Sequence, residues 1–451
     1  MPPTAAQPSP AKAAPITGAP PIGAPTASLT DRGRALIAAG VILGCAGWAL
    51  GFVDLFRVGL LAVILPLISV LLARRRLAPV RVTRRVETAR VTAGMSAQIV
   101  ATLHNPGART TPVLLGQELL SVGLGSPARF VLGPIPAGGQ RTVEYAIRPR
   151  RRGAHTVGPL RLVRRDPFGL TTAGVSSAGS LDIVALPVVH PLTGMVAAAG
   201  IGADGSSPAM LVIHGEHDAS IRGYRQGDDL RRIHWPVTAH RGELMVRHEG
   251  RPTLHRAVLI LDPHRSAGTA APAPEPAPEQ ASLDWAVEAM ASVACHLDDH
   301  GYALHLLTPA SIAAGHGDGR LPTPVLLREL ALLQSAPPLD TGGLGNPLHA
   351  RARDLLAGGG LVVAAVFDHD PASARAVLNL RPPGLPGIAF VVNTHRFATA
   401  APATGRAVEQ AEVLAAAAAD RGWAVSQVNG STTVPDAWAG LTRSPIPAVP
   451  R

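Results

Sequence analysis

The sequence is poor in aromatic residues and almost free of lysine. Aromatic side chains make up 3% of the 451 residues, too few for the base-stacking surface of a protein that binds single-stranded nucleic acid. The formal net charge is +10, yet Lys12 is the only lysine, and arginines spread over the whole length carry the positive charge. We therefore expect no specific nucleic-acid binding. Attraction to a membrane surface is the stronger expectation.

Cysteine is equally scarce. The two cysteines, Cys45 and Cys295, lie far apart, the first in an apolar stretch and the second in a helical one. This spacing excludes a disulfide framework and a zinc-knuckle pattern, and it fits a reducing compartment.

Long apolar runs are concentrated near the N-terminus. Residues 1–34 form a Pro/Ala-rich stretch that we expect to be a disordered tail. Two apolar runs follow, 35–53 and 58–73, separated by Asp54 and Arg57. Each is close to the roughly 20 residues that cross a bilayer, and the short connection predicts a transmembrane helical hairpin over 35–73. A signal peptide would lack the second run, and a buried core hairpin would show polar positions at helical spacing.

Arginines flank both ends of this hairpin. By the positive-inside rule, they predict a two-pass protein of the inner or plasma membrane, with both termini and all soluble domains in the cytoplasm. The flanking residues are Arg32, Arg34, Arg74, Arg75, Arg76, Arg81, Arg84 and Arg85.

In the next segment, 79–190, the long apolar runs give way to apolar residues that alternate with polar ones. Short alternating runs rich in Val and Thr, separated by Gly, Pro and Asn, predict an antiparallel β-sandwich of about seven strands. Residues 191–214 are a Gly-, Ala- and Ser-rich linker.

Residues 221–247 contain the densest charge in the chain. Gly227, Asp228 and Asp229 predict a turn and a helix start, and Pro236 predicts that this helix ends at Trp235. Beyond Gly242, residues 243–247 predict a half-buried strand in which Leu244 and Val246 alternate with polar neighbours. The many arginines and fewer carboxylates of this stretch indicate a network of ion pairs.

The stretch resembles the signature of the domain-of-unknown-function family fifty-eight, R-x-Y-x-x-G-D-D-x-R-x-I-x-W followed by G-E-L-M-V-R. Around it we delimit a signature segment, 215–255. The residues that we expect to form the signature face are Arg222, Tyr224, Gly227, Asp228, Asp229, Arg231, His234, Trp235, Glu243 and Arg247.

A second part of the chain carries the same resemblance. The strings R-R-G, G-P-L and D-P-F-G-L recur in the family and here end at 166–170. Their physical interpretation is a strand pair closed by a tight turn, to which we assign no chemistry.

The remaining chain alternates apolar strands with helices and predicts a doubly wound parallel sheet over 256–430, followed by a Pro-rich tail at 431–451. The expected strands are 257–261, 302–307, 361–367, 388–392 and 424–428. The expected helices are 283–297, 324–333, 347–356, 372–380 and 406–420.

The resemblance implies that this last domain is similar to a von Willebrand A domain, whose magnesium site takes D-x-S-x-S after the first strand. Here Asp262 and Ser266 match that motif, His264 replaces its first serine, and Thr341 and Asp368 stand where further ligands are expected. The opposing hypothesis, which we favour, is that Asp262 and Asp368 only cap strand ends and helix starts.

Three functions are compatible with these features, one of which is the binding of anionic lipid or nucleic acid through the arginine-rich segments. Relatives in the family are encoded beside a MoxR-type AAA+ ATPase, and often beside a transglutaminase-like membrane protein, which implies a non-enzymatic, membrane-anchored binding or assembly protein in a chaperone-like or envelope-associated system. The alternative is a hydrolytic or metal-dependent enzyme that uses Asp228, Asp229, His234 and His240. No cofactor other than magnesium is suggested.

Overall fold

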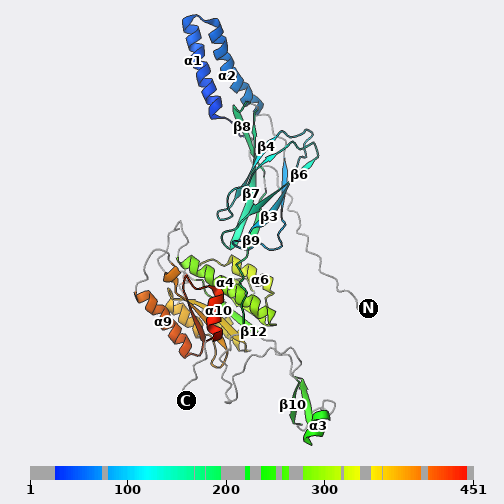
Figure 1. Cartoon of the computed structure of the whole chain (residues 1–451), viewed down its shortest axis with the longest axis vertical. Coiled ribbons are helices and arrows are strands. Elements are labelled where there is room, and N and C mark those ends of the chain that lie inside the picture. The colour runs from blue at the N-terminus through cyan, green and yellow to red at the C-terminus, as the bar shows by residue number, and fades with distance from the viewer. Residues whose placement is uncertain are drawn as a thin grey trace. The chain divides into compact units, whose positions relative to one another are not determined.

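The computed structural model describes residues 26–73, 80–166, 168–177, 179–194, 219–223, 235–249, 256–263, 278–315, 319–335, 347–357, 359–397 and 405–443. The chain divides into two compact units, Met1–Leu186 and Pro187–Arg451. The first unit contains a helical hairpin and a β-sandwich, and the second contains an α/β domain (Figure 1).

Two antiparallel helices form the hairpin, α1 (Asp31–Leu50) and α2 (Val53–Ala73). Both are long and apolar enough to cross a membrane. Thr30 begins α1, because its side-chain oxygen accepts a hydrogen bond from the Gly33 N–H at 3.2 Å. Gly51 ends α1 in the left-handed conformation, φ 76°, which favours glycine. The predicted hairpin is therefore confirmed as a pair of helices.

The hairpin begins earlier than predicted. Strand β1 (Thr26–Leu29) and the first turn of α1 occupy the end of the stretch that we expected to be a disordered tail. β1 pairs antiparallel with β8 (Thr171–Ser176) of the sandwich. This long-range pairing, which local composition does not reveal, orders the segment.

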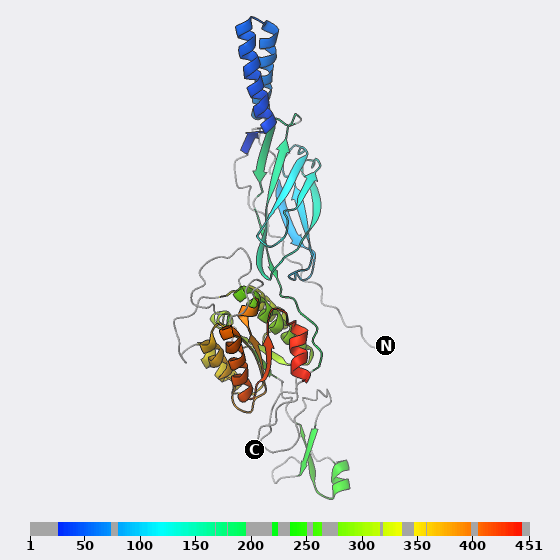
Figure 2. The same ribbon diagram turned by 60° about the vertical axis from the view of Figure 1, so that its left-hand side comes forward.

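The sandwich consists of two antiparallel sheets with a shared apolar core. One sheet has the order β2-β3-β6, formed by Arg81–Val86, Ala97–His104 and Gln140–Ile147. The other has the order β1-β8-β7-β4-β5, with β9 also paired to β7. Its remaining strands are β4 (Leu114–Leu120), β5 (Arg129–Leu132), β7 (Gly153–Arg165) and β9 (Leu181–Ala185). The predicted sandwich is confirmed, and the two sheets can be followed in Figure 2.

An ion pair lies inside this sandwich. Arg84 on β2 donates from Nε to Glu118 Oε1 at 3.0 Å and from Nη1 to the Gly179 carbonyl at 3.0 Å. The two side chains are 3% and 0% exposed. Arg84 was expected among the flanking arginines that set membrane topology, but burial against Glu118 gives it a role in the sandwich core instead.

The signature segment contains a small antiparallel pair of strands, β10 (Ala219–Gly223) and β11 (Met245–Glu249), with α3 (Trp235–Arg241) before β11. Pro236 lies in the first turn of α3, where a proline loses no intrahelical hydrogen bond. The predicted end of a helix at Trp235 is therefore wrong, and the helix start predicted at Gly227, Asp228 and Asp229 lies outside the described residues. The buried face of the following strand differs from the prediction, because Met245 is buried and Leu244 is exposed.

A five-stranded parallel sheet forms the core of the second unit, with the order β13-β12-β14-β15-β16. Its strands are β12 (Arg256–Leu261), β13 (Ala303–Leu307), β14 (Leu361–Phe367), β15 (Gly387–Val392) and β16 (Ala424–Val428). All five predicted strands are confirmed. Every residue of β14 and β15 is buried, as expected of strands covered on both faces.

Helices cover the two faces of this sheet (Figures 1 and 2). Val258, Ile260 and Val362 pack in one apolar cluster with residues of α7 (Pro347–Leu356), α8 (Pro371–Leu378) and α9 (Gly405–Asp420). α4 (Pro278–Asp299) contacts the sheet, α6 (Thr323–Leu332) and α10 (Val434–Arg443). The short α5 (Pro309–Ala313) follows β13.

Helix α10 corrects the prediction of a Pro-rich tail from 431. Its apolar residues Val434, Ala437, Trp438 and Leu441 are buried and recur at helical spacing. The prolines that suggested a tail lie mostly beyond Arg443.

Candidate functional site

The strand order places two carboxylates at the switch point of the parallel sheet. The chain enters at β12, adds β13 on one side, and then crosses over to add β14 on the other side. Asp262 follows β12 directly, and Asp368 follows β14. Ligands of doubly wound sheets bind at the carboxyl ends of the strands that flank such a switch point. This edge is therefore the candidate site.

Asp262 is bound to the helix that follows β14. Ser373 on α8 donates from Oγ to Asp262 Oδ2 at 2.6 Å, and the Ser373 N–H donates to Asp370 Oδ1 at 3.1 Å, which caps α8. A cavity of about 10 Å³ lies beside this contact, with Asp262, His369 and Ser373 in its lining. That volume holds about one water molecule, so this cavity has no room for a substrate.

Asp368 is fully buried and fixes the loop after β15. Its Oδ1 accepts a hydrogen bond from the Thr394 N–H at 2.9 Å, where the short 3₁₀ helix η3 (Thr394–Phe397) begins. His369 Nδ1 lies 3.0 Å from Thr394 Oγ1. Burial raises the pKa of the Asp368 carboxyl, while the Thr394 N–H and the nearby His395 act in the opposite direction.

The predicted magnesium ligands are only partly described. Asp262 and Asp368 lie at the ends of adjacent strands, and Ser266, Thr341 and His264 lie outside the described residues. Within the described part of the chain, no group of three or more His, Cys, Asp or Glu side chains could hold a metal ion. Asp368 accepts the backbone N–H at the start of η3, as the capping hypothesis expects, whereas Asp262 accepts the Ser373 hydroxyl and Asp370 caps α8. The magnesium site stays a prediction.

Only some of the predicted signature residues lie in the described part of the chain. Trp235, at the start of α3, is 65% exposed, and Glu243 is also exposed. His240 of the enzymatic alternative is exposed on α3. Arg222 and Arg247 lie on the paired strands β10 and β11, where Arg222 is opposite Val246. The other predicted signature residues, which lie outside the described residues, are Tyr224, Gly227, Asp228, Asp229, Arg231 and His234.

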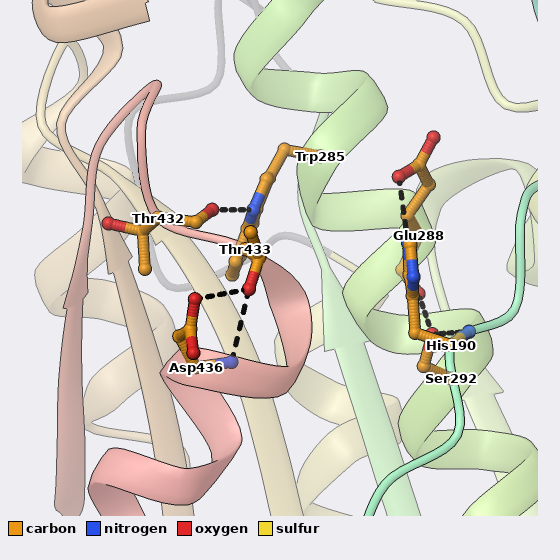
Figure 3. A network of polar contacts seen from close by, with 7 residues as sticks. All are labelled: His190, Trp285, Glu288, Ser292, Thr432, Thr433 and Asp436. Atoms are coloured by element: carbon orange, nitrogen blue, oxygen red, sulfur yellow. Dashed lines mark hydrogen bonds and ion pairs between the residues drawn. The ribbon is translucent and has the colours of Figure 1, made fainter.

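Sequence reasoning missed a polar network on α4, which Figure 3 shows. The His190 N–H donates to Ser292 Oγ at 2.9 Å, and His190 Nε2 lies 3.4 Å from Glu288 Oε2. Trp285 Nε1 donates to the Thr432 carbonyl at 2.8 Å, before α10. Residues 187–194, partly assigned to the linker, are therefore held along α4.

Segment 187–194 is also held at its C-terminal end, by His296 of α4. His296 Nε2 lies 3.0 Å from the Gly194 carbonyl, and Trp438 Nε1 donates to that carbonyl at 3.2 Å. Burial, and then the neighbouring His300, lower the pKa of His296. The spacing of the apolar residues around Trp438 could have revealed helix α10, but not its contact with Gly194.

Comparison with solved structures gives only weak likenesses. The alkylpurine DNA glycosylase AlkC of Pseudomonas fluorescens, bound to DNA containing an abasic site analog, is 17% identical, with 34% of this chain and 43% of that chain covered and a TM-score of 0.17. A β-glucosidase from Listeria innocua is 14% identical over 24% and 16% of the chains, with a TM-score of 0.15.

The CARDB domain of PF1109 from Pyrococcus furiosus is 11% identical over 22% of this chain and 94% of that one, with a TM-score of 0.15. The chain therefore spans less than half of the glycosylase and of the glucosidase. No curated protein matches the chain.

A family model matches part of the chain. The match covers β10, α3, β11, β12, α4, β13, α5 and α6, and so includes the exposed Trp235 and the first strand of the switch point. Residues 220–342 of this chain match the family described as "Protein of unknown function DUF58".

Proposed function

We propose that this chain is a two-pass membrane protein whose soluble domains act from the cytoplasmic side as a binding or assembly partner, without catalysis of their own. The observation that carries the anchoring is the distribution of side chains on the hairpin. Small residues face the partner helix, since Gly40 and Gly47 of α1 and Gly59 of α2 are buried.

Large apolar side chains point away from that contact. A helix pair in water buries such residues, whereas helices in lipid pack through small residues and expose the large ones. The exposed residues include Val41, Ile42, Trp48, Leu60, Leu61, Ile64, Leu67, Ile68, Leu71 and Leu72.

The binding role is supported by the signature segment. Trp235 is mostly exposed at the start of α3, and tryptophan is enriched among the residues that dominate protein–protein affinity. At the switch-point edge, Asp262 and Asp368 accept hydrogen bonds from neighbouring elements. Because both carboxylates are engaged in holding the structure, this edge fits a protein-binding surface better than an active site. We propose that the partner is a MoxR-type AAA+ ATPase, with a transglutaminase-like membrane protein as a further candidate, and that the sheet is von Willebrand A-like.

The test uses the full-length protein in detergent and a purified MoxR-type ATPase. Trp235→Ala is expected to weaken binding tenfold or more, because loss of a central tryptophan costs about 2 kcal/mol or more. Val413→Ala is the matched control, since Val413 is an exposed apolar residue on α9. Both variants should keep the melting temperature of the parent. Equal binding by Trp235→Ala and the parent would remove α3 from the interface, and absence of any binding by the parent would refute the partnership.

A further inference from the structure

The turn between β7 and β8 carries an exposed phenylalanine, Phe168, that is not part of the core of the sandwich. The Gly169 N–H donates to the Asp166 carbonyl at 3.0 Å, and the Leu170 N–H donates to Asp166 Oδ1 at 2.8 Å. Gly169 has φ 69°, in the region that favours glycine. This tight turn buries Leu170 but leaves Phe168 64% exposed. The predicted strand pair closed by a tight turn is confirmed, and its exposed apolar tip needs another explanation.

Hydrogen bonds fix this turn to the base of the hairpin. The Thr30 N–H donates to the Leu170 carbonyl at 2.9 Å, and Thr30 Oγ1 donates to the Gly169 carbonyl at 2.7 Å. A Cβ added to Gly33 would lie 2.4 Å from the Leu170 oxygen. The turn therefore touches the first turn of α1.

The end of α2 is held at the same level. Arg164 Nη2 donates to the carbonyls of Leu72 and Ala73 at 3.1 and 3.3 Å, and Thr171 Oγ1 donates to the Ser69 carbonyl at 3.5 Å. Both helices of the hairpin are thus bonded to residues that flank the turn, so that the turn cannot move independently of the hairpin base.

This attachment sets the depth of the turn, provided that the hairpin spans a bilayer as proposed above. The apolar run of α1 begins at Ala35, two to five residues beyond the contacts at Thr30 and Gly33. At about 1.5 Å per residue this is roughly 3–8 Å. The polar layer on each side of the hydrocarbon is about 5–7 Å thick. The turn therefore lies at the depth of the lipid headgroups.

The aromatic residues of the hairpin lie only at its opposite end. Trp48, Phe52 and Phe56 are exposed around the α1–α2 connection, as in the aromatic belt of a membrane protein. No aromatic residue occurs in 31–47 or in 57–73. Phe168 supplies an aromatic side chain at the base, where the hairpin has none.

A positive charge accompanies it. Arg32 is exposed, and its Nη1 lies 4.0 Å from the position of a Cβ added to Gly169. An apolar side chain beside a cation matches the chemistry of an anionic phospholipid surface. We propose that the 166–170 turn is a membrane-interface anchor, in which Phe168 inserts between lipid headgroups and Arg32 binds their phosphates, so that the sandwich is held at a fixed height on the bilayer.

The test measures immersion depth with spin labels on the full-length protein in vesicles of phosphatidylethanolamine and phosphatidylglycerol. Single cysteines are introduced by Phe168→Cys, Val122→Cys and Leu61→Cys, after Cys45 and Cys295 have been replaced by alanine. Val122 is the matched control, because it is 99% exposed on a loop of the same sandwich. It lies about 26 Å from the turn, since eight residues of β7 separate the two ends. Leu61 lies on the exposed face of α2.

The label at 168 is expected to be accessible to oxygen and shielded from a water-soluble nickel chelate, the label at 122 to be exposed to the chelate, and the label at 61 to be deepest. A label at 168 as exposed to the chelate as the label at 122, with the label at 61 deep, would overturn the interface anchor and leave the hairpin in the membrane. A label at 61 in water would overturn both proposals. In pure phosphatidylcholine vesicles the label at 168 should move towards water, and unchanged immersion would overturn the role of Arg32.

Discussion

Substitution of one glycine tests whether the hairpin is packed as the structure shows. A Cβ added at Gly59 would lie 2.5 Å from the backbone nitrogen of Gly44 and 2.7 Å from the Gly40 oxygen. Ordinary contacts of a Cβ begin near 3.4 Å. The obstacles are backbone atoms, which no rotation of a side chain can move away, so the helices in Gly59→Ala must separate by about 1 Å, enough to lose a quarter to a half of each dispersion contact.

Gly44 provides the matched control on the facing helix. A Cβ added there meets nothing within 4 Å. Gly44→Ala should therefore leave the interface intact, and it adds helix propensity of about 0.5–1 kcal/mol. Overpacking by Gly59→Ala should cost about 1–3 kcal/mol.

The assay is the unfolding of the hairpin in mixed micelles with increasing dodecyl sulfate. Energy transfer between dyes on Cys45 and on a cysteine introduced by Leu61→Cys, in a Cys295→Ala background, reports helix separation. The midpoint should fall in Gly59→Ala and stay unchanged or rise in Gly44→Ala. Equal midpoints for both variants would refute close packing of the two helices through Gly59.

Three further substitutions test the soluble domains through the melting temperature of the full-length protein. Arg84→Ala should cost about 3–5 kcal/mol, because it leaves Glu118 buried without its cation; a loss below about 1 kcal/mol would contradict the burial of the pair. Trp438→Ala should cost about 3–5 kcal/mol by emptying a fully buried site, whereas a tail at 431–451 would tolerate it. His296 has a pKa lowered by burial, so the unfolded chain binds more protons below about pH 6.5. Its contribution to stability should be present above that pH and be lost as the pH falls; His296→Gln should flatten this dependence, and an unchanged slope would refute it.

Local patterns predict those elements whose environment is uniform along their length. The strands of the parallel sheet are covered on both faces, so that residues such as those of β14 form continuous apolar runs in the sequence. The hairpin is equally visible, because nearly every position of α1 and α2 is apolar.

Features that depend on distant partners were not predictable in this way. β1 is ordered by pairing with β8, about 145 residues later. Arg84 and Glu118, 34 residues apart, appear in the sequence as unrelated charges. The contact of Asp262 with Ser373 spans 111 residues, and only the crossover between β12 and β14 brings their ends together.

The central claim, a hairpin in the membrane with the soluble domains on the cytoplasmic side, is tested most directly by thiol labelling in intact bacterial cells with a membrane-impermeant maleimide. The chain carries Phe52→Cys at the exposed hairpin tip or Val122→Cys on the sandwich, with both native cysteines replaced. The account predicts that Phe52→Cys reacts in intact cells and that Val122→Cys reacts only after lysis. Reaction of Val122→Cys in intact cells, or release of the protein from membranes by alkaline carbonate, would contradict it.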